Sequence, residues 1–306
     1  MNASLAAAPL VDPAPEPGRR RLLGGLGGGL ALAALPVLPA FAQQREGVQI
    51  GPPSQMSALS PPEEVVEQQA AQEYHQMLQQ ARARHLLAEP QHPQLVRLNY
   101  IAERLRPFAY MWNERARNWQ WETNLIGSKS INAFCMPGGK IAFFWGILTE
   151  LKLEDSEVAM IMGHEMTHAL RDHARAQMGK QAATQGLIGL GAALFGLGAG
   201  GRQLAGMGGQ LLSLKYSRDD ETEADLIGLE LAARAGYDPN SAISLWTKMN
   251  QVASGAPPAF LSDHPSNPDR MGKIQQNIPN VLGLYERAPK PDRKFGPPGM
   301  ASNSGR

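Results

Sequence analysis

The stretch His164-Glu165-Met166-Thr167-His168 decides how this sequence folds and what chemistry it can support. Its spacing is H-E-x-x-H, which on a helix places the two histidines a little over one turn apart. Both imidazoles then project from one face, about 6 Å apart, which suits two ligands of one tetrahedral zinc ion. Glu165 lies between them, close enough to take a proton from a metal-bound water. The motif therefore predicts a zinc centre with His164 and His168 as ligands and Glu165 as the general base.

The surroundings of the motif support this interpretation. A predicted helix begins near Asp155, and residues 158–162, which precede the motif, are apolar enough to be buried. Buried histidines beside a buried glutamate are costly unless a metal or hydrogen-bond partners compensate them. The structural alternative is a pair of core histidines with satisfied hydrogen bonds. The complete motif favours the metal.

A catalytic zinc needs a third protein ligand and an open position for water. The extended form H-E-x-x-H-x-x-G-x-x-H, which supplies a third histidine, is absent. A second predicted helix, residues 217–235, has Ser217 as its N-cap and carries Glu221 and Asp225 one turn apart. Glu221 could ligate zinc while Asp225 accepts a hydrogen bond from the far nitrogen of a ligand histidine. An acidic first turn that only caps the helix is the alternative, and Glu223 is a weaker candidate ligand because it points elsewhere on the helix.

These motifs and their order resemble those of a known family. The H-E-x-x-H helix and the later Ser217-Arg218-x-x-Glu221-x-x-Ala224-Asp225 look like the HtpX-like and BepA-like metallopeptidases, family forty-eight of the metallopeptidases. Further matching motifs are Asn132-Ala133-Phe134, Pro137-Gly138-Gly139, Gly146-Ile147-Leu148 and His264-Pro265-Ser266 with Arg270. The resemblance spans about residues 68–284. It implies a gluzincin-type zinc endopeptidase with one Zn²⁺ per chain and Glu221 as the third ligand.

The resemblance also implies a setting for the enzyme. Unlike HtpX itself, the chain has no apolar run around the motif that could span a membrane, so it resembles the periplasmic branch of the family. That branch acts in the quality control of outer-membrane proteins. The implied partners are therefore protein or peptide substrates, including misfolded outer-membrane proteins, and nothing in the sequence indicates membrane association.

His264 has three interpretations. It could donate a hydrogen bond to the oxyanion of a tetrahedral intermediate. It could instead occupy the fourth zinc position and displace the water, giving a latent enzyme, as is seen in the branch that the chain resembles. It could also be a capping or loop histidine. The sequence favours a position near the zinc but does not decide whether His264 stabilises the oxyanion or blocks the fourth zinc position as a plug. His173 lies about 140° around a continuous helix from His168 and is predicted to be a surface or helix-end residue.

Two other classes of protein remain as alternatives. The first is a latent or non-catalytic, chaperone-like binding protein, in which the zinc has a structural role and His264 fills its fourth coordination position. The intact Glu165 argues against it, because a structural site needs no base. A zinc amidase is the second alternative, which the family resemblance disfavours. For the peptidase, a strand at residues 141–144 is predicted either to pair with an extended substrate or merely to close the sheet.

The first 42 residues resemble an export signal. Three arginines at residues 19–21 precede an apolar, glycine-rich run, and Ala40-Phe41-Ala42 offers small residues at a cleavage site. The arginines also resemble a twin-arginine signal. We therefore expect export to the periplasm with cleavage near Ala42, the alternative being an uncleaved membrane anchor. Residues 43–60 are predicted to be a linker, residues 61–285 the zinc metallopeptidase domain and residues 286–306 a disordered tail.

Composition sets the fold class and excludes other functions. The chain has 306 residues, 43% of them hydrophobic, which is ordinary for a globular protein. Its net charge of +1 gives no reason to expect nucleic-acid binding, and its single cysteine, Cys135, excludes an intramolecular disulfide. Short strand patterns between residues 119 and 144 interrupt an otherwise helical chain, so the expected fold is mainly α with a small antiparallel β-sheet (α+β) and a central H-E-x-x-H helix. The glycine-rich residues 186–209 predict either two short helices or a flap.

Overall fold

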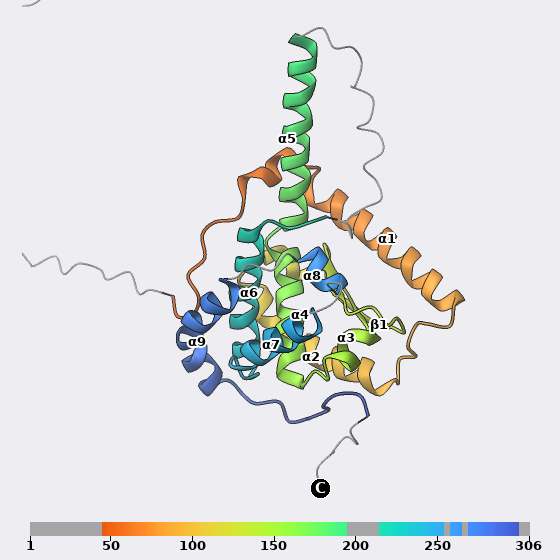
Figure 1. The fold of residues 1–306 in the computed structure, drawn as a ribbon, viewed down its shortest axis with the longest axis vertical. Coiled ribbons are helices and arrows are strands. Elements are labelled where there is room, and N and C mark those ends of the chain that lie inside the picture. The colour runs from red at the N-terminus through yellow and green to blue at the C-terminus, as the bar shows by residue number, and fades with distance from the viewer. Residues whose placement is uncertain (1–44, 195–213, 254–257, 265–268, 300–306) are drawn as a thin grey trace, which may run out of the picture. The chain divides into compact units, whose positions relative to one another are not determined.

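The computed structural model describes residues 45–194, 214–253, 258–264 and 269–299. The export signal predicted for residues 1–42 therefore lies outside the described residues. Helices dominate this part of the chain (Figure 1). They are α1 (Glu63–Ala83), α2 (Pro93–Ala109), α3 (Trp145–Glu150), α4 (Asp155–Leu170), α5 (His173–Leu194), α6 (Arg218–Arg234), α7 (Ser241–Val252), α8 (Ala259–Asp263) and α9 (Arg270–Arg287), with the 3-10 turns η1 (Gln55–Leu59) and η2 (Glu114–Arg117).

A three-stranded sheet lies between the helices and contains β1 (Glu122–Ile126), β2 (Ala133–Met136) and β3 (Lys140–Phe144) in the order β1-β3-β2. β2 and β3 form the expected antiparallel hairpin, whose turn contains Gly138 and Gly139 at φ values of +81° and +75°. β1 instead runs parallel to β3. The sheet is therefore mixed, which corrects the prediction of an antiparallel sheet. The hairpin determines the direction of β2, whereas β1 pairs with the free side of β3, and no local pattern determines the direction of that pairing.

Helix α4, which carries the H-E-x-x-H motif, lies in the middle of the fold (Figure 1). It packs against α2, α6, α7 and strand β2, and every residue from Glu157 to Leu170 is buried. A helix that is surrounded on all sides is apolar along most of its length, as the sequence before the motif indicated. The prediction of a mainly helical fold with a central motif helix is confirmed.

Two glycines let α4 and α6 approach each other closely. A Cβ added to Gly163 would lie 2.9 Å from the carbonyl oxygen of Gly228, and a Cβ added to Gly228 would lie 2.7 Å from the amide nitrogen of His164. Only glycine allows two helix backbones to come this near. The contact brings the first turns of α6 over the two motif histidines and so determines the site.

The predicted linker at residues 43–60 is, from residue 45 onward, a packed segment. Val48 is buried and donates its backbone N–H to Oε2 of Glu230 at 2.8 Å, while η1 packs against α5. The linker prediction was wrong because a polar, proline-rich composition does not reveal which buried carboxylate on α6 will accept these backbone groups.

The predicted disordered tail is also ordered in part. Helix α9 extends to Arg287, and the chain beyond it returns to the start of α4, where Phe295 donates its backbone N–H to Asp155 at 2.9 Å. Residues 300–306 lie outside the described residues. The compact domain is thus wider at both ends than the predicted residues 61–285.

The glycine-rich stretch at residues 186–209 lies only partly within the described chain. Its first residues, up to Leu194, continue helix α5, and residues 195–209 lie outside the described residues. Among the helices that the structure describes, none combines the length and apolar character needed to cross a membrane.

Candidate metal centre

The two histidines of the motif converge on one point. The Nε2 atoms of His164 and His168 lie 3.1 Å apart, and only 4% and 2% of the two residues is exposed. The helix brings both rings to one face, as the i, i+4 spacing predicted. Two imidazole nitrogens at this distance, away from water, are arranged to share a cation.

Glu221 approaches the same point from α6. The helix begins with a capping box in which Ser217 and Asp220 satisfy each other's backbone N–H groups, so the acidic first turn needs no further cap. Glu221 is fully buried, with Oε2 3.5 Å from Nε2 of His164 and Oε1 3.7 Å from Nε2 of His168. Its Oε2 atom forms an ion pair with Nη1 of Arg270 at 3.1 Å but accepts no aligned hydrogen bond within the described residues. A buried carboxylate that faces two imidazole nitrogens fits a metal ligand better than a helix cap, because Ser217 and Asp220 already cap the helix.

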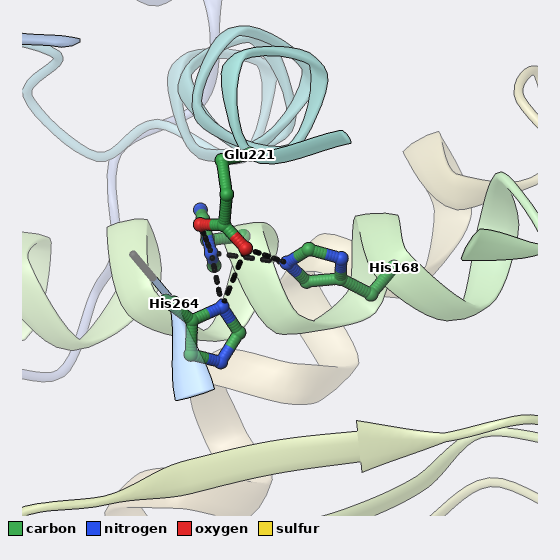
Figure 2. A group of neighbouring side chains, drawn as sticks. His168, Glu221 and His264 are labelled. Atoms are coloured by element: carbon green, nitrogen blue, oxygen red, sulfur yellow. Dashed lines mark hydrogen bonds and ion pairs between the residues drawn. The ribbon is translucent and has the colours of Figure 1, made fainter. Parts of the chain in front are cut away.

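His264, at the end of α8, joins these three residues (Figure 2). Its Nδ1 atom lies 3.3 Å from Nε2 of His164 and 3.0 Å from Oε1 of Glu221. One donor atom from each of the four residues lies within 4.8 Å of the others. A tetrahedral zinc with bonds of about 2.05 Å spaces its ligand atoms about 3.3 Å apart, so the described donors fit one zinc ion.

Glu165 faces the same region from the opposite side of His264. Its Oε1 atom lies 3.5 Å from Nε2 of His264 but without hydrogen-bond alignment, and it has no donor within the described residues. Burial raises the pKa of Glu165 to about 8, although the nearby His264 opposes this change. Burial alone would lower the pKa of His264, but the carboxylates of Glu165 and Glu221 outweigh it and the pKa is raised.

A cavity of about 110 Å³ opens beside Glu165 and His264. Residues of β2 and the end of β3 form part of its wall, together with side chains from α5 and from the segment before α6. Its apolar lining includes Phe134, Met136, Phe144, Ala174 and Leu214. An apolar cavity next to a general base is a suitable place for a substrate side chain.

Asp225 and Arg270 hold His164 from behind. Oδ1 of Asp225 lies 3.1 Å from Nδ1 of His164, the contact that the sequence predicted. Arg270 donates to both carboxylate oxygens of Asp225 at 2.7 Å, and its Nη1 forms an ion pair with Oε2 of Glu221 at 3.1 Å. Burial alone raises the pKa of Asp225, but Arg270 and His164 outweigh it, so the pKa is lowered and the carboxylate stays charged.

The prediction for His173 needs correction in part. The helix predicted from Asp155 ends at Leu170, Asp172 adopts φ 54°, and His173 begins the new helix α5. His173 is therefore a helix-end residue, one of the two predicted alternatives, but not a surface residue: it is only 1% exposed and contacts His168. The angle expected for a continuous helix does not apply once the chain turns. Glu223 lies outside the four-donor cluster, as predicted, but it binds His173.

Tyr216 lies at the candidate site, although no sequence pattern indicated it. Its ring stacks on the imidazole of His168, with centroids 3.9 Å apart and planes 17° from parallel, and it lines the cavity beside Glu165. An aromatic residue just before an N-cap is common, and only the packed structure shows which ring it covers. The stacked ring restricts the rotation of His168.

An H-E-x-x-H helix joined by a glutamate from a second helix defines the gluzincin class of metallopeptidase folds. The chain belongs to peptidase family M48, whose model matches residues 97–278, more than half of the chain. Enzymes of this family depend on zinc, and the four-residue cluster could hold one such ion.

Several known proteins are similar to the chain. It is 38% identical over 165 residues to the mitochondrial metalloendopeptidase OMA1 of Schizosaccharomyces pombe, covering 53% of this chain and 48% of that protein. It is 32% identical over 161 residues to a protein of Vibrio cholerae named as a beta-barrel assembly-enhancing protease, covering 48% of this chain and 32% of that one. It is 26% identical over 153 residues to metalloprotease LoiP of Escherichia coli, covering 49% and 60%. The chain thus spans about half the length of the curated relatives it matches.

Proposed function

We propose that the chain is a zinc-dependent endopeptidase that hydrolyses peptide bonds in protein or peptide substrates. The observation that carries this function is the convergence of His164, His168 and Glu221 beside the buried carboxyl of Glu165. A structural zinc site has no use for a base at its edge. Membership of family M48 supports the same reaction.

Each residue has a distinct role in this reaction. His164, His168 and Glu221 hold the zinc, which when bound polarises a carbonyl and lowers the pKa of a water towards 7. Glu165 takes the proton of the attacking water and then passes it to the leaving amine. Burial raises the pKa of Glu165 to about 8 in the metal-free chain, and the positive charge of a zinc ion nearby would lower this pKa and favour the carboxylate that accepts the proton.

The edge strand β2 receives the substrate. The sequence suggested the strand at residues 141–144 for this role, but β3 is flanked by β1 and β2 and has no free edge. β2 has a ladder partner on one side only within the described sheet, and its residues line the cavity beside Glu165. Main-chain pairing at such an edge binds extended peptides with little demand on their sequence.

His264 acts as a removable fourth ligand, so the described conformation is a latent form. Its Nδ1 atom is as close to His164 and Glu221 as the zinc ligands of one tetrahedral site would be. A fourth protein ligand occupies the position that the catalytic water needs. This proximity favours the plug over the oxyanion donor, since a donor would stand away from the metal on the side of the substrate.

The same closure supports a second candidate function. A site with four protein ligands is the usual form of a structural zinc, and a chaperone-like binding protein would need nothing more. Hydrolysis decides between the two functions, because only the peptidase uses Glu165 as a base.

For the location, we propose export and cleavage near Ala42, followed by work in the quality control of outer-membrane proteins. The arginines and apolar run of residues 1–42 support export. The similarity to a protein named as a beta-barrel assembly-enhancing protease supports the role, whereas the OMA1 relatives are named as mitochondrial. N-terminal sequencing of the protein from a periplasmic fraction tests the location: a first residue near Gln43 is expected, and recovery of the uncleaved chain contradicts it.

The central experiment measures zinc content and casein cleavage of the chain from Gln43 onward. The Glu165→Gln variant should retain one zinc per chain and lose cleavage, since the amide cannot accept the proton. Glu103→Gln, at an exposed glutamate on α2, is the matched control and should behave as wild type. Retained cleavage in Glu165→Gln would contradict the role of Glu165 as the general base. Zinc without cleavage in any form, His264→Ala included, would support the binding protein instead.

A further inference from the structure

The two motif histidines are held from behind in different ways. Nδ1 of His164 meets a carboxylate directly, in Asp225. Nδ1 of His168 instead lies 2.9 Å from Nδ1 of His173, and Nε2 of His173 lies 2.8 Å from Oε2 of Glu223. The carboxylate thus reaches His168 through a second imidazole.

Only one arrangement of protons satisfies the hydrogen bonds that link His168, His173 and Glu223. Nε2 of His168 faces the donor cluster, 3.1 Å from Nε2 of His164, so its lone pair must be free for a metal. The proton of neutral His168 is then on Nδ1 and is donated to Nδ1 of His173. His173 must accept there, so its own proton is on Nε2 and is donated to Glu223. Each ring carries one proton, and each hydrogen bond has one donor and one acceptor.

Glu223, at the far end of this series of hydrogen bonds, is held by a charged partner. Nη2 of Arg171 donates to Oε1 of Glu223 at 2.6 Å and to the backbone oxygen of Gly51 at 2.6 Å. His173 is 1% exposed and the side chain of Glu223 19% exposed, so the hydrogen bonds are largely shielded from water. The packed segment before α1 therefore supports the same chain of contacts through Gly51.

We propose that His173 and Glu223 are positioning residues for the metal: they hold His168 in the tautomer and orientation that present Nε2 to zinc. Neither residue belongs to the four-donor cluster, and neither touches the cavity. They act on the metal only through His168. This inference rests on the proposed zinc site, whose residues it supports from behind.

The test is the affinity for zinc, measured by competition with a chromophoric chelator on the chain from Gln43 onward. His173→Leu removes the acceptor for Nδ1 of His168 and should weaken zinc binding by about 10- to 100-fold. His173→Asn is the rescue variant, because its amide oxygen can accept near the position of Nδ1, and it should recover most of the affinity. His75→Leu, at a histidine on α1 whose side chain is 55% exposed, is the matched control and should leave the affinity unchanged.

A second readout separates positioning from simple packing. A purely structural loss lowers the melting temperature of the metal-free and zinc-loaded chains equally. A positioning loss reduces the rise in melting temperature that zinc produces, and this is the result expected for His173→Leu. Equal zinc affinity in wild type and His173→Leu would overturn only the positioning role of His173 and Glu223. A wild-type chain that binds no zinc would overturn both the proposed metal site and this positioning role. Zinc binding without cleavage would contradict only the proposed enzymatic function.

Discussion

Gly163 of α4 and Gly228 of α6 lie back to back, so close that a Cβ on Gly228 would stand 3.0 Å from the carbonyl carbon of Gly163. This contact places Glu221 over the two motif histidines from a separate helix. The spacing between the two motif histidines on α4 and Glu221 on α6 therefore depends on two residues outside the four-donor cluster.

Gly228→Ala should weaken both the fold and the metal site. The added methyl group forces the helices apart, and overpacking of this kind costs about 1–3 kcal/mol. We expect a lower melting temperature together with a lower affinity for zinc. Gly272→Ala in α9 is the control, since its Cβ would meet only the side-chain end of Asp269 at 3.2 Å. Unchanged zinc affinity in Gly228→Ala would show that the glycine contact does not set the ligand spacing.

Local patterns predicted most of what lies within one helix. Periods of three or four residues predict the spacing of His164 and His168, the cap at Ser217 and the position of Asp225 next to a motif histidine. These positions match the structure because the helices form where the sequence indicates them.

Features that depend on chain reversals and distant pairings could not be predicted in this way. The turn at Asp172, a non-glycine residue at φ 54°, brings His173 back to His168, and nothing in the pattern marks it. The parallel pairing of β1 with β3 and the docking of Val48 on Glu230 are likewise long-range. A polar segment can pack tightly when its backbone groups find buried acceptors elsewhere.

The ionisation of Glu165 should make the stability of the metal-free chain depend on pH. Its pKa in the folded chain is about 8, against an ordinary value of 4.5, so between these values the folded state binds more protons than the unfolded state. Stability from this group is complete below about pH 4.5 and is lost as the pH rises to about 8.

Glu165→Gln cannot ionise, so subtracting its stability from that of wild type isolates the effect from those of the neighbouring histidines. We expect wild type to lose free energy of unfolding relative to the variant as the pH rises from 5 to 8, measured by urea unfolding with a chelator present. Parallel curves for the two proteins would mean that Glu165 ionises normally.

The cavity beside β2 should select the substrate without affecting the metal. Ala174 is 3% exposed and lines this cavity on α5. Ala174→Leu fills part of the space, and a lost apolar contact of about 1–3 kcal/mol should lower kcat/KM for casein by tenfold or more. Zinc content should stay at the wild-type value. Ala83→Leu, at an exposed position on α1, is the control, and equal kcat/KM in all three proteins would exclude the cavity from substrate binding.

His264→Ala tests whether the described conformation is latent. Its Nδ1 atom lies 3.0 Å from Oε1 of Glu221, and its Nε2 atom lies 3.5 Å from Oε1 of Glu165, so one side chain covers both the metal position and the base. Removing it opens the fourth position for water and frees the carboxyl of Glu165. Casein cleavage should therefore rise several-fold while zinc affinity falls, because one donor of four is gone.

The opposite result has an equally definite meaning. If His264→Ala keeps its zinc and cleaves more slowly, His264 stabilises the oxyanion, and a loss of about 10²–10³ in kcat is typical of such a donor. The two roles also differ in the step they affect, since a plug changes the fraction of active enzyme whereas a donor changes the chemical step. Titration of active sites with a tight hydroxamate inhibitor separates them: the titratable fraction rises in His264→Ala if the histidine is a plug and stays constant if it is a donor.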